Sequence, residues 1–138
     1  MNNQYGLMEE KHKIEEACQT PHNAVNKHLQ KALTLLSDRK NPDYPNSMKE
    51  SISAVEALCK KITGDDKATL GKALDSLKKA QLPLHPSLLI AFDRLYGYTS
   101  DAGGIRHGSI DIATVDYPLA KFMLVTCSAF VDYIQSIS

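Results

Sequence analysis

Apolar residues recur at helical spacing along most of the chain. The clearest stripe runs from Met48 to Ile62 through Ile52, Val55 and Cys59, at alternating intervals of four and three residues. No segment of useful length alternates apolar and polar residues with the period of two that a half-buried strand requires. The pattern therefore predicts an all-helical chain.

Proline and glycine divide this chain into segments of helix length. Asp43, with Pro45 close behind it, is the predicted N-cap of the helix that carries the stripe, and Gly64 is its predicted end. His85 before Pro86 is most simply a cap as well. The expected helices cover about residues 6–19, 21–38, 44–63, 68–79, 86–96 and 116–137.

The same pattern predicts which side chains are buried. In the last helix the expected inner face comprises Leu119, Phe122, Met123, Thr126, Phe130, Ile134 and Ile137. Short connections favour antiparallel neighbours, so we expect an all-α, up-and-down four-helix bundle core with one or two additional helices. Residues 1–138 form one domain in this interpretation, and residues 1–20 form a peripheral or frayed helix.

Composition narrows the class of protein. The length of 138 residues suits one domain. The 16 Lys+Arg balance the 16 Asp+Glu, and a chain without net charge does not indicate non-specific binding to nucleic acid or membranes. The chain has no apolar run of about 20 residues and no apolar segment near its start, so we expect a cytoplasmic protein without a membrane partner. Cys18, Cys59 and Cys127 are far apart and are expected to be buried thiols. We expect neither a metal nor a cofactor.

One connection between predicted helices contains more aromatic, charged and titratable side chains than helix packing requires. Residues 96–108 hold two tyrosines, four glycines, Asp101, Arg106 and His107. Glycines let backbone approach a ligand, Arg106 is a permanent cation, and His107 titrates near neutral pH. A loop of this length also costs conformational entropy that a shorter one would avoid.

These residue types suit phosphodiester chemistry. An imidazole can take the proton of an RNA 2′-hydroxyl or protonate the leaving oxygen, and a guanidinium can hold the phosphate. Asp101, Arg106 and His107 are therefore the candidate catalytic residues. An ordered loop, with Arg106 paired to a carboxylate and His107 bonded to backbone, explains the same residues without catalysis.

Several segments resemble the HEPN-like domain of AbiJ-type abortive-infection proteins. They are residues 41–47, 49–58, 69–74, 95–101, 104–107 and 121–130, within a match over about residues 25–134. The resemblance implies a helical bundle that pairs through its loop, a role in anti-phage defence, and RNA cleavage. It also implies that the domain works beside an additional domain or partner protein.

The chain departs from the catalytic pattern of that family, in which an Arg, four to six residues and a His form the motif. Arg106 directly precedes His107, and Arg94 lies too far back. Two alternatives follow. Either Arg106 replaces the missing cation in a metal-independent endoribonuclease that acts as a homodimer, or the domain is a non-catalytic module for sensing RNA or nucleotides, or for dimerisation.

Other side chains are candidates for contacting RNA. Tyr96 and Tyr98 can stack on a base, although packing in the core or in a dimer is the simpler explanation of both side chains. Further candidates are Gly104, Glu50, Ser51 and Glu56. Glu56 lies at the border of the apolar stripe, where a carboxylate usually has a partner. Arg106 is one candidate for that partner, and a structural ion pair explains Glu56 more simply than contact with RNA.

Overall fold

The computed structural model describes residues 9, 11, 12, 14, 22–64, 70–79, 82–100 and 115–138. Its helices are α2 (Asn23–Ser37), α3 (Tyr44–Thr63), α4 (Leu70–Lys79), α5 (Pro86–Ser100) and α6 (Tyr117–Ile137). Residues 9, 11, 12 and 14 are helical too, and these described ranges contain no strand. The all-helical class is therefore confirmed.

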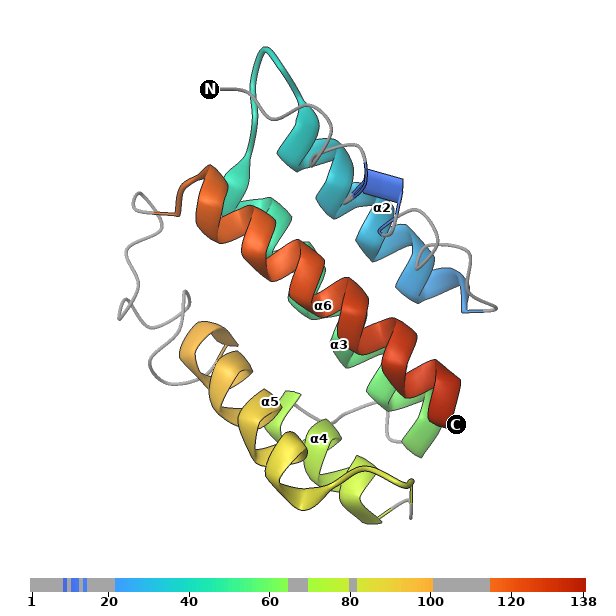
Figure 1. The fold of residues 1–138 in the computed structure, drawn as a ribbon. Coiled ribbons are helices and arrows are strands. Elements are labelled where there is room, and N and C mark those ends of the chain that lie inside the picture. The colour runs from blue at the N-terminus through green and yellow to red at the C-terminus, as the bar shows by residue number, and fades with distance from the viewer. Residues whose placement is uncertain are drawn as a thin grey trace.

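Helix α3 is the centre of the described fold, because it packs against α2, α4 and α6, and α4 in turn packs against α5. In Figure 1, α2 runs opposite to α3, whereas α6 runs in the same direction as α3 and lies over it. Helix α5 runs opposite to α6 and ends on the side where α6 begins (Figure 1). The up-and-down four-helix core stays a prediction.

Both ends of α3 are set by local interactions. The carboxylate of Asp43 accepts a hydrogen bond from the backbone N–H of Asn46 at 3.2 Å, and Pro45 lies in the first turn. At the other end Gly64 has a φ of 75°, and its N–H donates to the carbonyl of Lys60 at 2.8 Å. Only glycine adopts this left-handed conformation without strain. The predicted N-cap and the predicted end are both confirmed.

The buried arc of α3 is wider than the apolar stripe in the sequence. Met48, Ile52, Val55 and Cys59 are buried as predicted, whereas Ile62, the last residue of the stripe, is only partly buried. A second set, comprising Ser47, Ser51, Ala54 and Leu58, is buried beside them. The arc is wide because α2 and α6 cover two different sides of α3. Small side chains on the added part let another helix approach closely.

The predicted inner face of α6 is wrong in part. Met123, Phe130 and Ile134 are buried, but Phe122 is 53% exposed. The remaining buried positions of this helix are Ala120, Leu124, Cys127, Ser128 and Val131. Apolar residues lie on almost every side of α6, so several stripes fit the helical period. Packing against α3 and α2 selects one of them.

The inner face of α6 also contacts α5. The rings of Phe92 and Phe130 meet edge to face, with centroids 4.3 Å apart. Phe130 is buried, whereas Phe92 is only partly buried and lies at the margin of the core. This ring pair ties α5 to the rest of the fold.

Candidate functional site

The candidate catalytic residues follow α5. Asp101, Gly104, Arg106 and His107 lie outside the described residues, between the last residue of α5 at Ser100 and the N-cap of α6 at Asp116. Tyr96 and Tyr98 lie in the last turns of α5, and their side chains are also outside the described part. Their proposed contacts with RNA therefore stay predictions.

Glu50 is placed at the contact between α2 and α3. Its Oε2 lies 2.6 Å from Nδ1 of His28, and its Oε1 lies 3.3 Å from Nζ of Lys31. The carboxylate of Glu50 is partly desolvated, which by itself raises its pKa, but the hydrogen bonds and charges of His28 and Lys31 outweigh this effect and lower the pKa. Glu50 is thus held as a carboxylate with both oxygens occupied.

His28 is the residue in this cluster that the sequence did not single out. A carboxylate hydrogen-bonded to Nδ1 fixes the orientation of an imidazole ring. The side chain of His28 is 37% exposed, so this ring reaches solvent. No short motif links His28 to Glu50, because they are separated by 22 residues and belong to different helices.

Ser51 lies in the interior of the fold, where its side chain has a structural role. Its hydroxyl is fully buried and donates to the carbonyl of Ser47 at 3.0 Å. The hydroxyl of Ser47 in turn donates to the carbonyl of Ala32 on α2 at 2.7 Å. Buried hydroxyls must find such acceptors, since an unpaired one costs about 1–3 kcal/mol. The Ser51 hydroxyl is therefore satisfied within α3, and it is the Ser47 hydroxyl that joins α3 to α2.

Glu56 lies partly buried on α3, as expected for a carboxylate at the border of the stripe. Within the described residues no ion pair to Glu56 is present, and Arg106, the candidate partner named from the sequence, falls outside them. Glu56 does affect its neighbour. Burial, and secondly the charge of Glu56, raise the pKa of Cys59 to about 12. The Cys59 thiol therefore stays protonated and is not a nucleophile.

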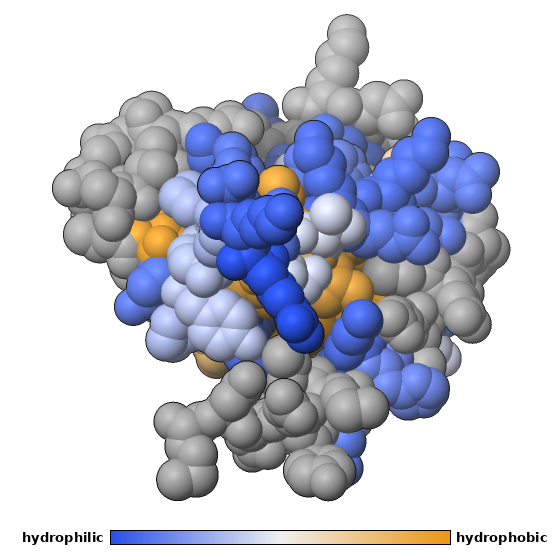
Figure 2. Space-filling model, turned by 90° about the horizontal axis from the view of Figure 1, so that it is seen from above, coloured by the Kyte–Doolittle hydropathy of each residue, from blue (hydrophilic) through white to orange (hydrophobic). Residues whose placement is uncertain are grey.

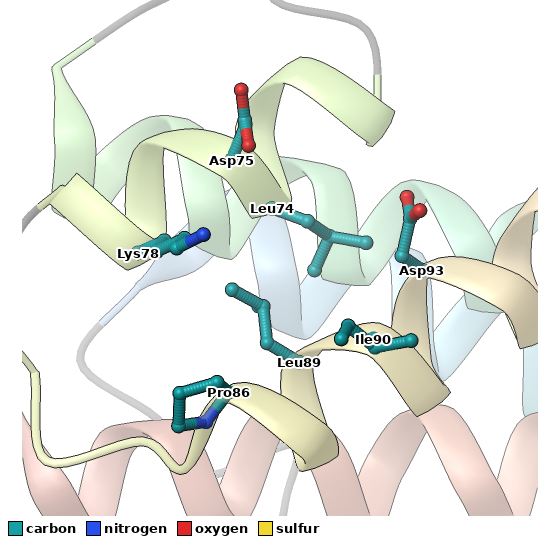
Figure 3. A pocket seen from close by; sticks show the side chains of 7 residues that line it. All are labelled: Leu74, Asp75, Lys78, Pro86, Leu89, Ile90 and Asp93. Atoms are coloured by element: carbon teal, nitrogen blue, oxygen red, sulfur yellow. The ribbon is translucent and has the colours of Figure 1, made fainter.

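A pocket of about 340 Å³ lies between α4 and α5 (Figure 3). Leu74, Leu89 and Ile90 point toward its interior, and charged groups stand around them. The complete lining is Leu74, Asp75, Lys78, Pro86, Leu89, Ile90 and Asp93. An apolar interior with a few charges suits a small amphipathic ligand. None of the predicted site residues lines this pocket.

The remaining described surface offers little further chemistry. His85 is a cap, as predicted, because its Nδ1 accepts the N–H of Ser87 at 3.0 Å. Among the residues described, no group of three or more His, Cys, Asp or Glu side chains is arranged to hold a metal ion. Seen from above, the described surface is mostly hydrophilic, with apolar areas between the hydrophilic residues (Figure 2).

Comparison with protein-family models, with curated proteins and with solved structures found no match to this chain. None of the described helices combines the length and the apolar character needed to cross a membrane. The observations define an all-helical protein with a polar cluster at α2–α3 and a pocket at α4–α5.

Proposed function

We propose that this chain is a HEPN-like domain of the abortive-infection type, which cleaves RNA without a metal ion as a cytoplasmic homodimer in anti-phage defence. The order of the helices along the chain is the observation that best supports this proposal. Helix α5 carries Tyr96 and Tyr98 in its last turns and leads straight into the segment with Arg106 and His107. The segments that carry the family resemblance begin in the α2–α3 connection and end in α6.

His107 is the proton carrier in this proposal. Its imidazole takes the proton of a ribose 2′-hydroxyl, and the 2′-oxygen attacks the neighbouring phosphorus to form a 2′,3′-cyclic phosphate. The bond from phosphorus to the 5′-oxygen breaks as the imidazolium gives the proton to that oxygen, which leaves as a 5′-hydroxyl. Arg106 binds the phosphate and stabilises the charge that develops on its oxygens. The internal nucleophile restricts the reaction to RNA.

Cleavage of RNA by purified chain tests this function. We expect His107→Ala to lower the rate by about 10²–10⁴-fold, because a positioned proton carrier contributes about that much. Arg106→Lys should also lower it, since an ammonium cannot bind phosphate through two parallel hydrogen bonds. Activity should persist in EDTA and be absent on DNA.

Matched controls separate chemistry from general loss of side chains. His85→Asn removes an exposed imidazole but keeps an acceptor at the α5 cap, and Arg39→Lys changes an exposed guanidinium in the α2–α3 connection. Both should cleave like the parent chain. Intact RNA after incubation with folded parent chain, alone or with its partner domain, would exclude the nuclease.

A non-catalytic dimerisation or sensing module is the second candidate. The observation that favours it is an apolar outer face on α6, where Phe122 and Tyr133 are exposed. Exposed aromatic side chains on one helix face are typical of a binding surface. In this case RNA stays intact, and His107→Ala changes dimer stability or partner binding instead.

A further inference from the structure

The outer face of α6 is apolar along most of the helix. Phe122 is 53% exposed and Tyr133 is 37% exposed, and Thr126 and Ala129 lie between them at helical spacing. In Figure 1, α6 lies over α3, with α2 to one side and α5 to the other, and no described helix covers its outer side. The apolar surface of such a face is removed from water only if something packs on it.

We propose that a second copy of this chain docks on this face, with the two α6 helices antiparallel across a twofold axis. This inference rests on the homodimer of the proposed function but places its contact on α6, and not on the loop through which the family resemblance implies pairing. The order of the four side chains is nearly palindromic, with large aromatic rings outside and small side chains inside. An axis midway between Thr126 and Ala129 places Phe122 of each copy opposite Tyr133 of the other. The small central residues allow the two helices to approach closely.

Charge complementarity favours the same arrangement. Lys121, whose Nζ lies 6.0 Å from the ring centre of Tyr117 one turn earlier, and Asp132 are eleven residues apart, about three helical turns. They lie on the same edge of the face and about 16 Å apart along it. Antiparallel packing brings Lys121 of each copy beside Asp132 of the other, which forms two reciprocal ion pairs. A parallel pair leaves these charges about 16 Å apart and forms neither contact.

The same charges argue against nucleic acid as the occupant of this face. A surface that binds a polyanion gathers several cations, whereas this one carries a single lysine and a single aspartate at its edge. The uncharged centre between them is the composition that interfaces between proteins show at their core. A second copy of this chain satisfies the apolar centre and both edge charges at once.

Charge-swap variants of the full chain test this inference by sedimentation equilibrium. Lys121→Asp and Asp132→Lys each create two like-charge contacts, and each should weaken dimerisation by about tenfold or more. The double variant Lys121→Asp/Asp132→Lys restores both pairs with their signs reversed and should recover most of the affinity. Lys49→Asp, which changes an exposed lysine on α3, is the matched control and should dimerise like the parent chain.

Other occupants give different results. A parent chain that stays monomeric up to about 100 µM overturns the inference, because a specific interface binds at least at micromolar strength. If the α6 substitutions leave dimerisation unchanged, whereas substitutions of Arg106 or His107 dissociate the dimer, the inference is also overturned and the interface lies at the loop. RNA cleavage is measured separately, so an intact α6 dimer without cleavage would reject the nuclease and keep this interface.

Discussion

Two phenylalanines on α6 give a direct test of the packing. Phe130 is 1% exposed and packs edge to face against Phe92, whereas Phe122, two turns earlier, is 53% exposed. Phe130→Ala removes a buried ring and leaves a cavity, so we expect the free energy of unfolding to fall by about 3–5 kcal/mol. Complete burial of such a ring contributes about 2–3 kcal/mol. Phe122→Ala removes less than half of this burial free energy and opens no cavity, so we expect the free energy of unfolding to fall by about 1 kcal/mol or less.

Urea unfolding followed by far-ultraviolet circular dichroism measures both losses. The series is repeated at several protein concentrations, because association adds stability that depends on concentration, and the dilute limit reports the folded chain alone. Phe130→Ala should lower stability by at least about 2 kcal/mol more than Phe122→Ala at this limit. Equal losses, or a larger loss for Phe122→Ala, would mean that the buried face of α6 is misassigned.

Variants at two further positions test individual interactions. Glu50 has a lowered pKa in the folded chain, so its stabilisation is complete above the pKa of an unfolded glutamate, about 4.3, and is lost as the pH falls through the lower folded value. Glu50→Gln should therefore lower stability at neutral pH and flatten its decline between about pH 5 and pH 3, and parallel urea midpoints across this range would reject the cluster. Gly64→Ala should cost about 1–2 kcal/mol in urea unfolding, because a Cβ there meets no atom within 4 Å and only the positive φ opposes it. Gly64→Asn should cost less, since asparagine tolerates this conformation, and equal losses for the two variants would contradict the backbone explanation.

Local interactions made much of the fold predictable. The start of α3 at Asp43, its end at Gly64 and the cap of α6 at Asp116 each depend on hydrogen bonds between residues at most four apart. The burial of Cys59 followed from a stripe on one helix. Such features are determined by neighbouring residues, because caps and helical periodicity depend on no other part of the chain.

Contacts between helices were not predictable in this way. The pair of His28 and Glu50 joins residues 22 positions apart and exists only because α2 and α3 pack in a particular register. The exposure of Phe122 has the same origin. Apolar residues on nearly all sides of α6 leave its rotation open, and only the simultaneous packing of α6 against α3 and α2 selects the face that water reaches.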